Sequence, residues 1–201
     1  MNSHYSLQLT AQDALVLVDV QNDFLPGGSL AVPDGDKVVP VLNRCIKLFL
    51  QQQLPIFATR DWHPSNHCSF KSYGGIWPTH CVQHSSGAEF AADLHLPENT
   101  VIISKDDTPI LNSYSGFTHT TLSQQLRTLG CSRLFIGGLA TDYCVLNTVL
   151  DAIKEGFNVI LLEDAIRAVN LSPDDGDKAI ARMKEAGATC IHIERLANVA
   201  V

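Results

Sequence analysis

The chain has 201 residues, of which 45% are hydrophobic and 17% charged, so it can bury a sizeable core and is not a disordered chain. It carries 14 Lys and Arg against 21 Asp and Glu, and this net charge of −7 argues against a nucleic-acid or anionic-membrane partner. No apolar run is long enough to span a bilayer and no signal peptide is visible, so we expect a cytoplasmic protein with reduced cysteines.

Short apolar runs alternate with amphipathic stretches along the chain. The apolar runs predict six strands, at residues 14–20, 54–59, 100–104, 133–137, 158–162 and 189–193. The amphipathic stretches predict helices at 40–53, from Leu122 to a stop at Gly130, at 142–155, and from a cap at Ser172 and Pro173 to near Gly187. This alternation predicts a mainly parallel sheet with helices on both faces.

Five residues with reactive side chains follow predicted strands. They are Asp19, Asp61, His63, Lys105 and Cys144. Because parallel sheets bind ligands beyond the carboxyl ends of their strands, we expect these side chains to gather at one edge. The irregular segment at 60–98 is far longer than the usual connection of about 4–6 residues, and long loops of this kind are commonly functional.

Cys144 follows a predicted strand and the glycines at 137–138, which allow close approach of the backbone to a ligand. Thr141 is a good helix N-cap and would place Cys144 in the first turn, where free N–H groups favour a thiolate. The alternative is a cysteine that packs on the inner face of a helix.

Asp19 and Lys105 each end an otherwise apolar strand, and a buried charge there is costly unless it is paired. One interpretation is a structural ion pair at the sheet edge. The other adds Cys144, because an acid can deprotonate a thiol and return the proton to a leaving group while a cation biases both pKa values.

The segment at 60–98 holds a second candidate group, formed by Asp61, His63, His67 and His80. These residue types suit Zn²⁺ or a neighbouring first-row metal, although no spacing among them is diagnostic and scattered surface histidines are the alternative. The sequence contains neither GxGxxG nor GxxxxGK[ST], so dinucleotide-binding and P-loop functions lack their glycines.

Six motifs occur in a fixed order along nearly the whole chain. They are 18–24 (VDVQNDF), 60–64 (RDWHP), 77–82 (WPTHCV), Lys105, 113–117 (SYSGF) and 138–145 (GLATDYCV). Together they resemble the nicotinamidases of the isochorismatase-like cysteine hydrolase superfamily. The resemblance implies a single three-layer α/β/α domain over residues 1–201, with a six-stranded, mainly parallel sheet and a metal-site loop at about 60–98.

The resemblance also implies a function, the hydrolysis of nicotinamide to nicotinate and ammonia through a cysteine thioester in NAD salvage, with pyrazinamide accepted as well. It assigns catalysis to Asp19, Lys105 and Cys144. It assigns the oxyanion hole to the N–H groups of Ala140 and Cys144, beside a cis peptide bond between Leu139 and Ala140.

By the same resemblance, one divalent ion is held by Asp61, His63 and His80, with His67 as a further direct ligand or a contact of bound water. Zinc is the first expectation, and iron or manganese are alternatives. Family positions that wall the substrate ring correspond to Phe24, Leu30, Trp77 and Tyr114, for which ordinary core packing is the alternative.

One departure from the family is Asp106, which follows Lys105 where relatives often have glycine; it adds a carboxylate near the site and leaves the local loop geometry open. A homo-oligomer is usual for the family. The competing functions are another amidohydrolase of the superfamily, acting on a carbamoyl or ureido group, and a non-catalytic metal or thiol sensor on this fold.

Overall fold

The computed structural model describes residues 6–196, and its centre is a six-stranded sheet in which all neighbouring strands are parallel. The strand order is β3–β2–β1–β4–β5–β6. The strands are β1 (Asp13–Val18), β2 (Ile56–Asp61), β3 (Val101–Lys105), β4 (Arg133–Leu139), β5 (Asn158–Arg167) and β6 (Thr189–Ile191). The predicted fold class is therefore confirmed.

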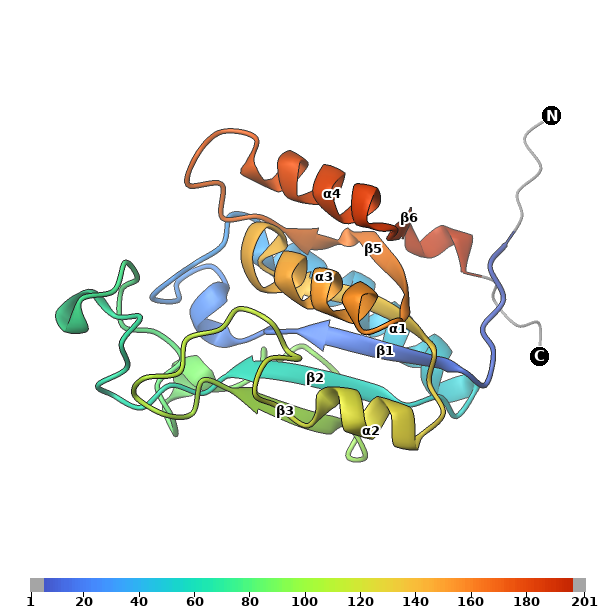
Figure 1. Cartoon of the computed structure of the whole chain (residues 1–201), viewed down its shortest axis with the longest axis horizontal. Coiled ribbons are helices and arrows are strands. Elements are labelled where there is room, and N and C mark those ends of the chain that lie inside the picture. Colours follow the sequence, from blue (N-terminus) through green and yellow to red (C-terminus); the bar gives the residue numbers. More distant parts are fainter. Residues whose placement is uncertain (1–5, 197–201) are drawn as a thin grey trace.

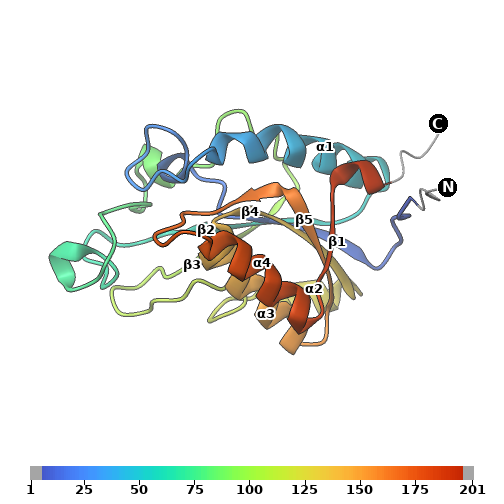
Figure 2. The ribbon, with the colours of Figure 1, turned by 90° about the horizontal axis from the view of Figure 1, so that it is seen from above.

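Helices cover both faces of this sheet, so the molecule has three layers (Figure 2). On one face lies α1 (Val38–Gln51), and on the other lie α2 (Leu122–Thr128), α3 (Leu146–Lys154) and α4 (Asp175–Ala186). Alternate residues of β1 enter the two cores: Leu15 contacts the α1 side and Val16 the α3 side. A central parallel strand is buried on both faces, which explains its continuous apolar sequence. Among the helices described, none combines the length and apolar character needed to cross a bilayer.

The central strands β1 and β4 approach each other closely where they end. Gly138 lies opposite Val18, has a φ of 129°, and would place a Cβ atom 2.1 Å from the Val18 carbonyl oxygen. Only glycine fits both the left-handed backbone and this space. The glycine pair noted in the sequence therefore serves strand packing at the carboxyl end of the sheet.

Three helix starts differ from the sequence prediction, and that of α1 lies at Val38, two residues before the predicted start at 40. The segment predicted as one helix at 142–155 begins as a wide, π-helical turn (Thr141–Val145) before α3. The last helix starts at Asp175 and not at Ser172, because Asp174 has a left-handed φ of 67° and the Asp175 carboxylate accepts a hydrogen bond from the Ser172 N–H at 2.8 Å. The side chain that was expected to cap the helix therefore lies in the turn before it.

The connection from β2 to β3 is the long irregular segment expected from the sequence, and it lies at the carboxyl ends of the strands (Figure 1). Isolated bridges fold it back on itself and on the chain after β1: His63 pairs with Val82, Phe70 with Trp77, and Gln21 with Phe90. These contacts give the long loop a defined shape without regular strands or long helices.

Candidate active site

Lys105, the last residue of β3, lies at the centre of a buried group of reactive side chains. Its Nζ atom lies 2.9 Å from Asp19 Oδ2 and 3.6 Å from Cys144 Sγ, and it also donates to Asp61 Oδ1. Asp61 stands opposite Lys105 in the β2–β3 register, which places the two side chains together. The structure thus brings together Asp19, Lys105 and Cys144, as predicted, and adds Asp61 to them.

Asp19 follows β1 directly, is fully buried, and has a left-handed φ of 47°. Its Oδ1 atom accepts a hydrogen bond from the Thr59 hydroxyl at 2.6 Å, whereas Oδ2 has no hydroxyl or backbone partner among residues 6–196 and lies 2.9 Å from Lys105 Nζ. Burial raises the pKa of this carboxyl, although the Lys105 charge opposes the rise. One oxygen is therefore held in place while the other remains available beside Lys105 and Cys144.

Cys144 lies in the wide turn before α3, and its geometry corrects the sequence prediction. The residue before the turn is Ala140, Thr141 makes no capping bond, and Cys144 is the fourth residue of the turn. Burial raises the pKa of the Cys144 thiol well above its ordinary value; Lys105 opposes this shift and Asp19 adds to it. The expected thiolate is therefore not the resting form, and the thiol needs a base.

The peptide bond between Leu139 and Ala140 is cis, as the resemblance implied. The carbonyl of Ala140 accepts hydrogen bonds from the N–H groups of Tyr143 and Val145, both at 3.1 Å. Within the described residues, no acceptor is bound to the Ala140 N–H. Ala140 lines the same pocket as Cys144.

Asp61 also faces the two predicted metal-binding histidines. Its Oδ2 atom lies 3.6 Å from His63 Nε2 and 3.9 Å from His80 Nε2, and all three residues are buried. The Nδ1 atom of His80 lies 2.7 Å from the Pro78 carbonyl oxygen, and that of His63 lies 3.4 Å from the Asp106 carbonyl oxygen. Histidine ligands usually have a backbone or carboxylate partner on the nitrogen that does not bind metal, so this donor set fits a divalent ion.

His67 lies beside this group but has both ring nitrogens engaged. Its Nδ1 atom lies 2.7 Å from the Ser69 hydroxyl, and its Nε2 atom bonds to the Leu111 carbonyl oxygen. Its ring stacks on His63, with 4.1 Å between the ring centroids. In this arrangement His67 supports the His63 ring, and together with His63 and Asp106 it also forms a second group of possible metal ligands.

A pocket opens onto these side chains, and the four predicted ring-wall residues all line it. Trp77 donates a hydrogen bond through Nε1 to the Tyr114 hydroxyl at 3.0 Å. The Tyr143 ring packs edge-on against both, with its centroid 4.9 Å from Trp77 at 82° and 5.2 Å from Tyr114 at 63°. The lining consists of Phe24, Leu30, Asp61, His63, Ser69, Trp77, His80, Asp106, Asn112, Ser113, Tyr114, Ala140, Tyr143, Cys144 and Val169.

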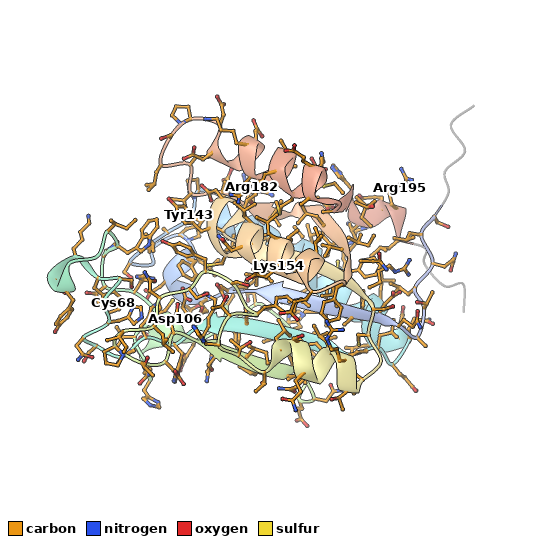
Figure 3. All side chains as sticks on the ribbon, in the orientation of Figure 1. Cys68, Asp106, Tyr143, Lys154, Arg182 and Arg195 are labelled. Atoms are coloured by element: carbon orange, nitrogen blue, oxygen red, sulfur yellow. The ribbon has the colours of Figure 1, made fainter. Side chains whose placement is uncertain are left out.

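Sequence reasoning missed Tyr143, although its position beside Cys144 was a signal, and it left the role of Asp106 open. Asp106 has a left-handed φ of 56°, and its two carboxylate oxygens lie 3.0 and 2.9 Å from the Ser113 N–H. It lies at the same end of the sheet as Tyr143 and Cys68 (Figure 3). The carboxylate thus closes the loop after β3, and burial raises the pKa of Asp106 to about 6.

A cysteine, an aspartate and a lysine in contact at the carboxyl edge of a parallel α/β/α sheet define a site of the cysteine-hydrolase type. Residues 13–195 match the Isochorismatase domain, and the chain belongs to the isochorismatase family.

Three relatives are similar over most of their length. The nicotinamidase of Escherichia coli (strain K12) is 42% identical over 197 residues, covering 88% of this chain and 92% of the relative. The crystal structure of the pyrazinamidase of Pyrococcus horikoshii in complex with zinc has a TM-score of 0.87 and 49% identity, covering 90% of this chain and 99% of that one. The crystal structure of PnC1 from L. infantum in complex with nicotinate has a TM-score of 0.89 and 38% identity, covering 96% and 98% of the two chains.

Proposed function

We propose that this protein is an amidohydrolase that converts nicotinamide into nicotinate and ammonia, and that it also hydrolyses pyrazinamide. The observation that carries the proposal is one pocket that joins Cys144, the Asp61–His63–His80 donor set and an aromatic wall. The relatives named nicotinamidase and pyrazinamidase, and the neighbour that binds nicotinate, support this choice of substrate.

A carboxamide is a poor electrophile, so its carbon needs a strong nucleophile and its oxygen needs stabilisation. Asp19 takes the proton from Cys144 Sγ as the sulfur attacks the carbonyl carbon. The raised pKa of Asp19 makes it a better base than an ordinary carboxylate, and Lys105 holds both partners in place. The N–H groups of Ala140 and Cys144 bind the oxygen that becomes negative.

The tetrahedral intermediate then breaks its carbon–nitrogen bond. Asp19 gives the proton to the leaving nitrogen, ammonia departs, and the acyl group remains on Cys144 as a thioester. In the second half-reaction Asp19 takes one proton from water as the water oxygen attacks the thioester carbon. The carbon–sulfur bond then breaks, Asp19 returns that proton to Cys144 Sγ, and the acid leaves as nicotinate while its own proton passes to ammonia or solvent. Atoms and protons balance over the two steps, and one carboxyl serves both because it cycles between its two forms.

The proposal places one divalent ion on Asp61, His63 and His80. Burial lowers the pKa of His80, although the Asp61 charge opposes this, and the neutral imidazole is the form that ligates. A bound ion supplies Lewis acidity and a fixed positive charge at the end of the pocket that holds the ring. Zinc suits two histidines and a carboxylate and is present in the Pyrococcus horikoshii neighbour; iron and manganese are the alternatives.

The proposal has further parts that rest on the family resemblance. We propose that residues 1–201 form one domain, that the copies associate as a homo-oligomer, and that the protein acts in the cytoplasm. Light scattering coupled to size-exclusion chromatography measures the assembly, and cell fractionation measures the location.

The deciding experiment measures ammonia release by the purified protein from nicotinamide and pyrazinamide, before and after treatment with a strong chelator. We expect release from both amides, loss after chelation, and recovery when Zn²⁺ is restored. Release from carbamoyl or ureido compounds alone would favour the other branch of the superfamily. Metal binding without release from any of these compounds would favour a sensor.

A further inference from the structure

Gln21 is fully buried next to the active site, and both the oxygen and the nitrogen of its carboxamide form hydrogen bonds. Its Oε1 atom accepts a hydrogen bond from the Asp61 N–H at 2.8 Å. Its Nε2 atom donates to the carbonyl oxygens of Asp61, at 2.8 Å, and Ala88, at 2.9 Å. One side chain therefore holds both backbone polar groups of Asp61, the residue that links Lys105 to the two histidines.

The reason for this arrangement lies in the way β1 ends. The last bond between β1 and β2 runs from the Asp19 N–H to the Thr59 carbonyl oxygen at 3.2 Å. If the parallel ladder continued, its next bond would join the Asp61 N–H to the Asp19 carbonyl oxygen. The left-handed backbone of Asp19 turns the chain away, and the Asp19 carbonyl instead accepts the Gln21 N–H at 2.9 Å.

The carboxamide of Gln21 thus takes the place of the backbone that β1 no longer supplies. Buried N–H and C=O groups are almost always paired, and without Gln21 both groups of Asp61 would be left unpaired on this side. On its other side, Asp61 is in register with Lys105 in β3, where the Trp62 N–H donates to the Lys105 carbonyl oxygen at 3.1 Å. Gln21 is therefore the link that fixes Asp61 relative to the turn carrying Asp19.

We propose that Gln21 is a positioning residue that sets the place of Asp61 between Lys105 and the two histidines. The inference rests on the proposed function, because it assumes the roles given there to Asp19 and Asp61. The two oxygens of the Asp61 carboxylate have different partners: Oδ1 contacts Lys105, and Oδ2 faces His63 and His80. A shift of the Asp61 backbone disturbs the metal site and the Lys105 contact together.

The test compares Gln21→Met, which keeps the length of the side chain without its hydrogen bonds, and Gln21→Glu, which keeps one acceptor and loses both N–H donors. Asn43→Leu is the matched control, because the Asn43 carboxamide also spans a backbone segment, donating to the Asp93 carbonyl oxygen at 2.7 Å and accepting the His95 N–H at 2.9 Å. Asn43 does not line the pocket.

Competition with a chelator measures Zn²⁺ affinity, and steady-state kinetics with nicotinamide give kcat and KM. Circular dichroism and thermal unfolding measure folding. We expect Gln21→Met to weaken Zn²⁺ binding by about 10- to 100-fold, the usual cost of losing a partner that orients a ligand, and to lower kcat. Gln21→Glu should fall between Gln21→Met and the wild type. Asn43→Leu should lower the Tm but leave Zn²⁺ affinity and kcat within about twofold of the wild type, since distant sites act independently.

Wild-type Zn²⁺ affinity and kcat in Gln21→Met would overturn the inference, and so would equal losses in Asn43→Leu. Failure of both Gln21 variants to fold would also overturn it, because Gln21 would then be needed for folding rather than for positioning. A wild-type protein that neither binds Zn²⁺ nor releases ammonia would defeat the proposed function itself, and that failure is recognised before any variant is compared.

Discussion

The two ends of β1 each carry a fully buried aspartate, Asp13 at the start and Asp19 just beyond the last residue. At the Asp13 end, Arg133 donates through Nε to Oδ1 at 2.7 Å and through a terminal nitrogen to Oδ2 at 2.6 Å, and the Thr10 N–H adds a further bond at 2.7 Å. At the Asp19 end, one oxygen accepts a hydrogen bond from Thr59, and the other lies 2.9 Å from Lys105 Nζ, which Asp61 and Cys144 share.

The difference teaches which feature separates a structural ion pair from a reactive one. Residue type, strand and burial are the same at both ends, so none of them distinguishes the two. The planar guanidinium of Arg133 satisfies both oxygens of one carboxylate and has no other acidic partner among residues 6–196. Lys105 is a point charge shared by two carboxylates and a thiol, so one oxygen of Asp19 remains free to accept a proton.

The largest effect is expected from removing the nucleophile at the Asp19 end. Cys144→Ala should lower kcat below about a thousandth of the wild-type value, because no other group in the pocket can form the thioester. The fold and bound metal should be unchanged, since alanine is small and apolar. Steady-state ammonia release and elemental analysis measure both; more than a tenth of wild-type activity would rule out the thioester mechanism.

The comparison itself is tested by the same substitution at both ends. Asp19→Asn should abolish turnover nearly as fully as Cys144→Ala, because proton transfer fails in both half-reactions, while changing stability little. Asp13→Asn should cost about 3 kcal/mol of unfolding free energy by breaking the pair with Arg133 and should leave kcat unchanged. Denaturant unfolding and kcat are measured for both variants. A loss of kcat in Asp13→Asn would show that the Asp13 end also affects the reaction.

The metal proposal predicts a smaller and more specific loss at the Asp19 end. His63→Ala or His80→Ala should reduce bound metal from about one ion per chain, because each removes one of three protein ligands. Elemental analysis after purification without chelator measures the content. His95→Ala, an exposed histidine outside the pocket, serves as the control and should keep its metal. Full occupancy in the His63→Ala/His80→Ala double variant would place the metal elsewhere.

Asp106 predicts a change of stability with pH. Its pKa is raised by burial from 3.8 to about 6, so the folded protein holds this proton more tightly than the unfolded chain. The stabilisation is complete below pH 3.8 and is lost as the pH rises through about 6. As the pH is raised from 3.8 to about 6, the wild type should lose stability that Asp106→Asn keeps, so the Tm of the variant minus that of the wild type should increase. A Tm difference that stays constant over this range would show that Asp106 does not titrate there.

The smallest effect is expected at the pocket wall. Trp77→Phe keeps an aromatic ring but removes the hydrogen bond to the Tyr114 hydroxyl. The loss of one hydrogen bond, about 0.5–1.5 kcal/mol, should raise KM roughly 2- to 10-fold with kcat nearly unchanged. A fall in kcat at constant KM would show that this wall acts on the reaction and not on binding of the ring.

The sequence predicts the strands well because their apolar runs are continuous, and it predicts that Asp19, Lys105 and Cys144 meet because parallel strands end at one edge. It does not predict that Asp61 pairs with Lys105, since that contact depends on the register of β2 and β3. The wide turn at Cys144 also escapes prediction, because it is held by tertiary bonds: the Asp142 carboxylate accepts the N–H groups of Val169 and Asn170 at 2.9 and 2.8 Å.

The close approach at Gly138 has a consequence for catalysis. Val18 and Gly138 are partners in neighbouring strands; Asp19 follows the first directly, and the turn that carries Cys144 follows the second by a few residues. The spacing of the two backbones at this point therefore sets the distance between the proposed base, Asp19, and the proposed nucleophile, Cys144. Even the single methyl group of an alanine at 138 would meet the Val18 carbonyl oxygen and force the strands apart. The absence of a Cβ atom at Gly138 therefore determines how far the proton would travel from Cys144 to Asp19.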